Sequence, residues 1–245
     1  MATVTEIAPD IFRISFFADR FGLEFNEFII RDEQPMLFHT GPRKTFGEIF
    51  EAARRVIDPS KLRWIGFSHF ESDECGALNE WLTVAPDAQP LCGVVAANVC
   101  INDFSERPAR ALVHDEVVVL GRHRMRYQRT PHVPHCWDAG LMFEETERTL
   151  FCSDLFGQRG QHPPVTEGDI VGPAADSMRG AQSTPMADSM PYTPYTGRLL
   201  AGLAELRPAT LAIMHGPAWR GDGSAAILAL AGAVRDVYGQ DNHAA

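Results

Sequence analysis

The sequence predicts an α/β protein in which helices pack on the outside of β-sheets. Short apolar or alternating runs, which are typical of strands, occur in both halves of the chain. Segments with apolar residues at helical spacing, such as Phe46–Val56, lie between them. No linker divides the 245 residues. We therefore expect residues 1–245 to form one domain with helices outside its sheets.

The elements of the first half follow from these patterns in chain order. Strands are expected at Ile11–Phe17, Glu24–Ile30, Met36–His39, Leu62–Phe67 and Leu91–Val95. Helices are expected at Phe46–Val56 and around Leu78, Trp81 and Leu82, where the apolar residues share one face. The break at Thr40-Gly41-Pro42 separates the early strands from the first helix.

The second half is predicted to continue with two hairpins. They pair Glu116–Leu120 with His123–Arg129, and Gly140–Glu144 with Thr149–Ser153. A helix at Gly197–Leu206, a strand at Thr210–Met214 and a helix over Ser224–Val237 complete the chain. Residues 158–191 lack periodicity and are rich in Gly, Pro, Ser and Met. We expect a long loop insertion there, acting as a lid, a dimer contact or a mobile surface segment.

Composition excludes several classes of function. The formal net charge of −10 argues against a nucleic-acid or anionic-membrane surface, because both need basic patches. No apolar run approaches the roughly 20 residues that span a bilayer, and the N-terminus does not resemble a secretory signal. Five cysteines without a Cys-x-x-Cys pair indicate free thiols in a cytoplasmic protein.

Side chains that can bind metals follow four of the predicted strands. His69, Glu71 and Asp73 follow the strand that ends at Phe67, and Asp154 and His215 follow two later strands. A fourth strand runs into "TPHVPHCWD", which offers His132 and His135. Ligands commonly gather outside the carboxyl ends of strands in sheet-based α/β proteins. Solvated loop carboxylates are the ordinary alternative for any one of these residues, but their joint occurrence favours a metal site.

The number and type of these side chains predict two ions. Alternate residues of an extended segment point to one side, so His69, Glu71 and Asp73 can converge. Six or seven ligands exceed the need of one ion, and Asp154 has two oxygens with which to bridge a pair. The set is half carboxylate, which favours iron or manganese over zinc.

These residues resemble the metallo-β-lactamase fold, whose pattern is His-x-His-x-Asp-His followed by a His, an Asp and a His. The branch of flavodiiron and oxygen-binding diiron proteins replaces the second His with Glu. The resemblance rests on "HFESDE", "TPHVPHCWDA", "LFCSDLFG" and "IMHGPAWR", with "LFHTG" as the early strand and loop. It implies a four-layer αββα sandwich with two iron ions. By position, His69, Glu71 and His135 would hold one iron, Asp73 and His215 the other, and Asp154 would bridge.

Three departures from the family pattern bear on the site. Glu74 stands where the family usually has His, and is either a ligand or a neighbour of the ligands. His39 replaces the Asp common in the early loop, which removes an acceptor next to the site. The third departure is the flavodoxin domain, which flavodiiron enzymes carry after this core, and we expect no flavin site here. His132 is a separate matter: it is a weaker candidate ligand than His135, whose spacing to Asp138 fits the family.

The resemblance implies a non-haem diiron protein that binds O2 or another small diatomic ligand. It would act as a sensor, or as an O2 or NO reductase that takes electrons from a protein such as a rubredoxin or flavoprotein. A metal-dependent hydrolase is the alternative, and a metal-stabilised scaffold without turnover is a third hypothesis. We expect a homodimer, and Tyr192, Tyr195 and Trp219 are candidate pocket residues.

Overall fold

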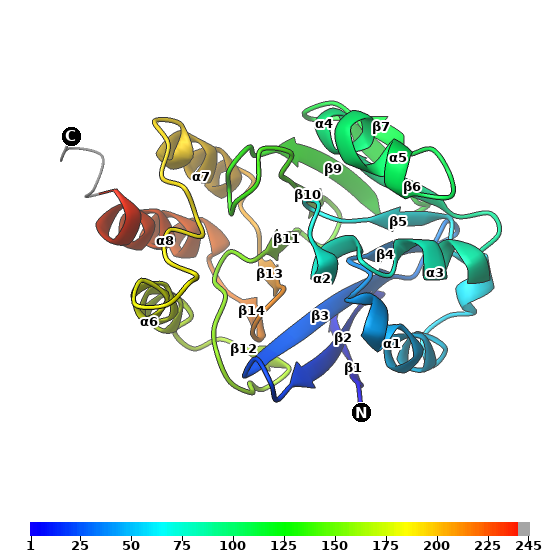
Figure 1. Cartoon of the computed structure of the whole chain (residues 1–245), viewed down its shortest axis with the longest axis horizontal. Helices are drawn as coiled ribbons and strands as arrows, with labels where there is room; N and C mark the ends of the chain where they lie inside the picture. The colour runs from blue at the N-terminus through cyan, green and yellow to red at the C-terminus, as the bar shows by residue number, and fades with distance from the viewer. Residues whose placement is uncertain (240–245) are drawn as a thin grey trace.

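Two β-sheets of seven strands each face one another in the computed structural model, which describes residues 1–239 (Figure 1). Helices cover the outer face of each sheet, so the layers run helix, sheet, sheet, helix. The predicted α/β class and the four-layer sandwich are therefore confirmed. None of the helices within residues 1–239 has the length and apolar character needed to cross a bilayer. The cytoplasmic location stays a prediction.

The first sheet has the strand order β1-β2-β3-β4-β5-β6-β7. Its strands are β1 (Thr3–Ala8), β2 (Ile11–Ala18), β3 (Leu23–Ile30), β4 (Met36–Phe38), β5 (Trp64–Gly66), β6 (Gln89–Gly93) and β7 (Arg110–Leu112). The strands from β1 to β4 pair antiparallel, and those from β4 to β7 pair parallel. Parallel pairing places the carboxyl ends of β4, β5 and β6 at one edge of the sandwich.

The second sheet has the order β12-β14-β13-β11-β10-β9-β8. Its strands are β8 (Val117–Val119), β9 (Arg124–Arg129), β10 (Gly140–Glu144), β11 (Thr149–Ser153), β12 (Val165–Thr166), β13 (Thr210–Ile213) and β14 (Ala218–Arg220). Both predicted hairpins are present, as the antiparallel pairs β8–β9 and β10–β11. Because β11 and β13 pair parallel, the loops after them start at the same edge.

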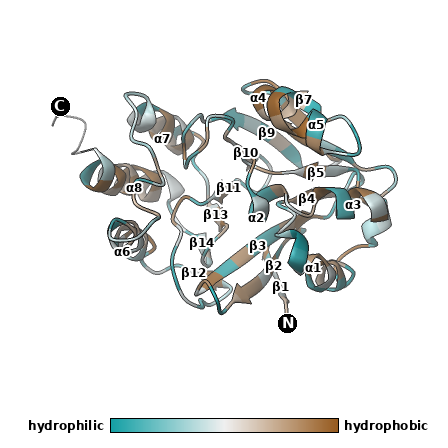
Figure 2. Cartoon of the chain, viewed as in Figure 1, coloured by the Kyte–Doolittle hydropathy of each residue, from teal (hydrophilic) through white to brown (hydrophobic). Residues whose placement is uncertain are grey.

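The helices form two groups on opposite sides of the sandwich (Figure 1). Those beside the first sheet are α1 (Phe46–Ala53), α2 (Ser72–Cys75), α3 (Leu78–Val84), α4 (Val94–Ala96), η3 (Ala97–Ile101) and α5 (Asn102–Phe104), with the short turns η1 (Arg43–Thr45) and η2 (Pro59–Lys61). Those beside the second sheet are α6 (Val171–Ala181), α7 (Thr196–Glu205) and α8 (Gly223–Tyr238). Hydrophobic and hydrophilic residues share the longer helices (Figure 2), and the apolar side packs inward.

Three apolar clusters hold the layers together. Between the two sheets the Phe151 ring meets Phe28 edge-on and Phe38 at a tilt, with ring centroids 5.4 and 5.1 Å away. Trp81 of α3 lies in the cluster between the first sheet and its helices, and its indole N–H donates to the Thr40 carbonyl at 3.1 Å. The third cluster joins the second sheet to α6, α7 and α8. Burial of these faces supplies the main driving force for the sandwich.

The expected loop at 158–191 contains strand β12 and helix α6, so that part of the prediction is wrong. Helix α6 could not be recognised from the spacing of its apolar residues. Its buried residues are Ala174 and Ala175 alone, and two adjacent alanines do not form an apolar stripe. Pro173 is compatible with this helix because it lies in the first turn, where its missing N–H has no intrahelical partner. Strands β1, β7 and β14 and the helical segment 94–104 were also not predicted, and the strand expected at Leu91–Val95 ends at Gly93, where that helical segment begins.

We predict an acid-sensitive contribution to stability from Glu144, at the end of β10. Its carboxylate lies 3.0 Å from His123 Nδ1 and accepts the backbone N–H groups of Thr146 at 2.9 Å and Glu147 at 2.6 Å. Burial alone would raise the pKa of Glu144, but these contacts hold that pKa below its usual value. A lowered folded-state pKa stabilises the protein above the unfolded-state pKa of about 4.3, and the contribution is lost as the pH falls through the folded-state pKa. Glu144→Gln should therefore lower the urea midpoint more at about pH 7 than at about pH 3.5.

The control for this experiment is Glu205→Gln, because Glu205 is an exposed residue at the end of α7. Its effect on the urea midpoint should be small at both pH values. An equal loss of stability at both pH values for Glu144→Gln would contradict the prediction.

Candidate metal centre

The carboxyl ends of β5, β11 and β13 bring the predicted ligands together. His69 lies in the loop after β5, Asp154 directly follows β11, and His215 follows β13. The short helix α2 begins after Glu71 and carries Asp73 in its first turn. These loops meet because the strands that precede them end at the same edge of the facing sheets.

Four ligand atoms form the first cluster, which we call site 1: His69, Glu71, His135 and Asp154. All lie within 4.8 Å of one another. Glu71 Oε2 is 3.0 Å from His69 Nε2 and 2.9 Å from His135 Nε2. The two imidazole nitrogens are only 2.7 Å apart. Asp154 Oδ2 completes the group at 3.2 Å from His135 Nε2.

Three ligand atoms form the second cluster, which we call site 2: Asp73, Asp154 and His215. His215 Nε2 is 3.4 Å from Asp73 Oδ2 and 3.1 Å from Asp154 Oδ1. Asp154 therefore faces site 1 with Oδ2 and site 2 with Oδ1. This is the arrangement that a carboxylate bridging two cations requires.

The model of the ODP family, whose description is "ODP family beta lactamase", matches residues 23–184, more than half of the chain. The chain belongs to the ODP family. The individual relatives have low sequence identity to this chain. The rubredoxin-oxygen oxidoreductase of Megalodesulfovibrio gigas is 25% identical over 139 residues, which cover 56% of this chain and 34% of the relative. The anaerobic nitric oxide reductase flavorubredoxin of Klebsiella pneumoniae is 28% identical over 141 residues, which cover 56% and 29%.

Solved structures share the fold over almost the whole ODP chain. The rubredoxin oxygen:oxidoreductase of Desulfovibrio gigas superposes with a TM-score of 0.81 and 21% identity, covering 94% of this chain and 61% of that one. The flavodiiron protein of Giardia intestinalis gives 0.77 and 16%, covering 98% and 60%. A fragment (residues 1–254) of the putative diflavin flavoprotein A 5 of Nostoc gives 0.79 and 18%, covering 99% and 98%. The ODP chain spans about a third of the length of the curated relatives it matches.

Hydrogen bonds on the far side of two imidazoles, those of His215 and His69, set the orientation of these rings. His215 Nδ1 lies 2.8 Å from the carbonyl of Glu24 in β3, which makes Nδ1 the donor and leaves Nε2 to face site 2. His69 Nδ1 lies 2.6 Å from Ser68 Oγ. The Asn26 amide donates to the carbonyls of Ile213 and Gly216 at 2.8 Å each. Such bonds orient ligands before a metal arrives.

Glu74 is not part of either cluster, so its role as a ligand is not supported by the geometry. Its carboxylate is fully buried and accepts from Ser68 N at 2.9 Å and from Ser153 Oγ at 2.6 Å. His39 Nε2 lies 2.9 Å from Glu74 Oε2, and His39 is also fully buried. Glu74 and His39, the two residues that depart from the family pattern, therefore contact each other. With Glu74 turned to His39, site 2 offers one ligand residue fewer than site 1.

The other residues singled out in the sequence lie outside the two clusters. The His132 ring joins neither site, whereas Cys136 Sγ lies within 4.8 Å of ligand nitrogens of His69 and His135. Tyr195 is 56% exposed, with the Arg198 guanidinium 5.1 Å from its ring centre. Tyr192 and Trp219 pack against the cluster beneath α6–α8, and the Trp219 indole donates to the Gly168 carbonyl. Their role as pocket residues stays a prediction.

The electrostatics of the metal-free site favour a bound cation. Burial alone would lower the pKa of His69, but carboxylates, with Glu74 first among them, raise it to about 10. Burial also opposes a proton on His215, yet neighbouring carboxylates raise the pKa of His215 well above its usual value. Hydrogen bonds from His135 and His69 lower the pKa of Glu71. Without a metal the imidazoles hold protons that balance the carboxylates, and a cation can replace those protons.

The donor set fits two divalent iron ions. Site 1 presents two imidazole nitrogens and two carboxylate oxygens, and site 2 presents one nitrogen and two oxygens, with Asp154 common to both. Iron accepts imidazole, and carboxylates suit harder divalent ions. Glu71 is 45% exposed while His69 is fully buried, so the centre faces solvent on one side. A small ligand would have access from that side to ions held by these residues.

Sequence reasoning missed the residues that hold the ligands in place. Glu24 and Asn26 lie in β3, which is buried along most of its length, and Arg13 of β2 pairs with the Glu24 carboxylate at 2.7 Å. Arg13 also donates to the Gly216 carbonyl at 3.1 Å, beside His215. Glu24 and Asn26 could have been noticed in the sequence as polar residues inside an otherwise apolar strand. Buried polar groups nearly always have hydrogen-bond partners, so their presence indicates a polar contact in the interior.

Proposed function

We propose that this ODP-family chain is a diiron protein that binds O2 or NO. The observation that carries the proposal is the division of ligands around Asp154, with His69, Glu71 and His135 on one side and Asp73 and His215 on the other. The titles of several solved relatives name di-iron proteins, which supports iron and gives no support to zinc or manganese. Two curated relatives are named for oxygen and for nitric oxide, which supports a diatomic ligand.

The chain's own residues would orient the ions and leave one side open. Glu71 reaches between two imidazoles from the exposed side, while the rings of His69 and His215 are fixed from behind by Ser68 Oγ and the Glu24 carbonyl. Phe25 packs edge-on against the His215 ring at 5.0 Å and keeps water from that flank. Ferrous ions, when bound, supply the electrons and the open coordination position that O2 or NO requires.

We further propose that the chain reduces its diatomic ligand when a partner protein supplies electrons, and acts as a sensor when none is present. The name rubredoxin-oxygen oxidoreductase, borne by one relative, supports a partner of this kind. A homodimer stays a prediction.

Anaerobic reconstitution with ferrous iron tests the proposal. We expect two iron ions per chain and a change in the optical spectrum when O2 or NO is admitted to the reduced protein. Zinc-loaded protein is the control, because zinc has no redox chemistry. A chain that binds zinc but not iron, shows no spectral response to O2 or NO and hydrolyses esters would overturn the proposal in favour of a hydrolase.

A further inference from the structure

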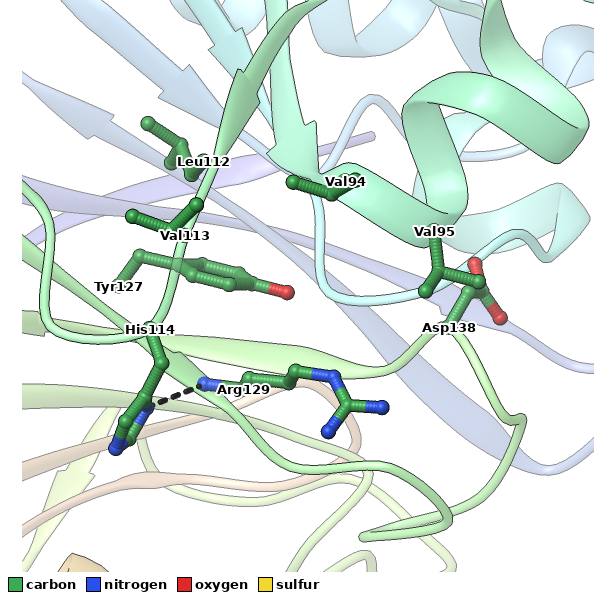
Figure 3. A pocket seen from close by; sticks show the side chains of 8 residues that line it. All are labelled: Val94, Val95, Leu112, Val113, His114, Tyr127, Arg129 and Asp138. Carbon is green, nitrogen blue, oxygen red and sulfur yellow. Dashed lines mark hydrogen bonds between the residues drawn. The ribbon is translucent and has the colours of Figure 1, made fainter.

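A cavity of about 160 Å³ lies beside the metal centre, where β6 and β7 meet β9 (Figure 3). Its apolar wall is made by Val94 and Val95 of α4 and by Val113, which follows β7. Helix α4 is coloured as largely hydrophobic in Figure 2. Val94 is 40% exposed and Val113 60% exposed, so this wall leaves apolar surface in contact with water. A cavity of about 150 Å³ is large enough for benzene.

The Tyr127 hydroxyl points into this cavity (Figure 3). Tyr127 is only 3% exposed. Its hydroxyl passes between Gly93 and Gly140, and a Cβ atom at either glycine would collide with it. Among residues 1–239 no group forms a hydrogen bond with this hydroxyl. A hydroxyl that faces a cavity can donate to, or accept from, a water or a ligand bound there.

Two charged side chains and His114, whose Nδ1 accepts the Arg129 backbone N–H at 3.2 Å, complete the polar part of the cavity. Arg129 of β9 extends along its floor (Figure 3), and its guanidinium has no ion-pair partner in the described part of the chain. Asp138 is 4% exposed and accepts the backbone N–H of Phe70 through Oδ2 at 2.9 Å. No ion pair joins Arg129 to Asp138, so the guanidinium is free to bind an anion.

We propose that this cavity binds a small carboxylic acid anion with an apolar body about the size of benzoate. Arg129 would take the carboxylate through two parallel N–H groups, and the Tyr127 hydroxyl would donate to one of its oxygens. The apolar body would lie against Val94, Val95 and Val113. The proposal does not depend on the diiron function, because none of these residues belongs to site 1 or site 2.

The cavity is nevertheless connected to the metal centre. Asp138, which lines it, holds the backbone of Phe70 between the site 1 ligands His69 and Glu71. A carboxylate can also bind directly to an iron ion, so binding alone does not locate the ligand. The experiment therefore uses variants in the cavity that do not touch the ligands of either site.

Isothermal titration of the iron-loaded chain with sodium benzoate tests the proposal. We expect saturable binding of benzoate at one site. The neutral analogue benzamide should bind at least about tenfold more weakly, because it cannot form the charge-assisted pair. Arg129→Gln should weaken benzoate binding by about tenfold or more, because it removes the charge-assisted pair. Tyr127→Phe, which removes only the oxygen, should weaken it by roughly threefold to tenfold.

The matched control is Arg124→Gln. Arg124 lies on the same strand as Arg129, is exposed, and pairs with Glu145 at 2.9 Å away from the cavity. Benzoate affinity should not change in this variant. Saturable binding that is equally tight in Arg129→Gln and in the parent chain would place benzoate elsewhere and overturn the proposal. The absence of saturable binding to the parent chain would also overturn it.

Discussion

Replacing Asp154 with alanine is expected to remove the ion at site 2 and to weaken the ion at site 1 by more than about a hundredfold. Loss of a group that merely supports a ligand already costs about 10- to 100-fold in metal affinity, and Asp154 is itself a predicted ligand of both sites. Site 2 would keep only Asp73 and His215, and site 1 would keep His69, Glu71 and His135. Two protein ligands do not make a stable cation site, whereas three still can.

Metal content after gel filtration and competition with a chelator measure this effect. We expect two iron ions per parent chain and at most one per Asp154→Ala chain. Asp236→Asn is the matched control, because Asp236 is 68% exposed on α8 and lies outside the clusters. It should retain both ions. An Asp154→Ala chain that retains two tightly bound ions would refute the bridging role.

A second measurement separates metal loss from misfolding. In the metal-free chain Asp154 lies among other carboxylates, and Asp73 and Glu74 both repel it. Contacts with His215 and His69 nevertheless hold the pKa of Asp154 below its usual value, so its removal should lower the melting temperature of the metal-free protein at neutral pH and leave a cooperative unfolding transition. The rise in melting temperature that iron gives to the parent chain should be lost in the variant.

The convergence of the six predicted ligands could be anticipated from the sequence, because strand ends can be located in it and the loops after such strands meet at one edge of the sandwich. The hairpin β10–β11 has the predicted bounds, and Asp154 follows it as expected. The distances could not be read from the sequence. The sharing of Asp154 between the two sites depends on the register of β11 against β13, which pairs Ser153 with Ile213 after a shift. Sequence periodicity does not specify register between strands so distant in the chain.

The role of Glu74 shows the limit of reasoning by position. Its place in "HFESDE" left it open whether Glu74 binds a metal or supports the ligands. The structure leaves its carboxylate outside both clusters, with Oε2 2.9 Å from His39 Nε2 at the end of β4 and Oε1 3.8 Å from Nδ1 of His69, on the far side of that ring from site 1. His39 itself adopts a φ of 65°, an uncommon backbone conformation for a residue other than glycine. Neither the orientation of the Glu74 side chain nor the backbone conformation of His39 can be predicted from a single sequence.

Replacing Glu74 with alanine is expected to lower the free energy of unfolding of the metal-free chain by about 3–5 kcal/mol, the range for a buried pair that loses one partner. Three buried groups would lose their acceptor at once: Ser68 N–H, Ser153 Oγ–H and His39. Relief of repulsion with neighbouring carboxylates opposes this loss. We expect the loss to dominate, because an unsatisfied buried donor costs about 1–3 kcal/mol.

A double-mutant cycle isolates the pair from the rest of the network. Urea unfolding of the chain, of His39→Ala, of Glu74→Ala and of the double variant gives the coupling free energy between the two side chains. Because both residues are fully buried and 2.9 Å apart, we expect the double variant to be more stable than the sum of the single losses predicts, by about 1–3 kcal/mol. Glu205→Ala, at an exposed site on α7, controls for loss of a carboxylate. Additive losses would mean that Glu74 acts through Ser68 and Ser153 alone, and that the two departures from the family pattern are energetically independent.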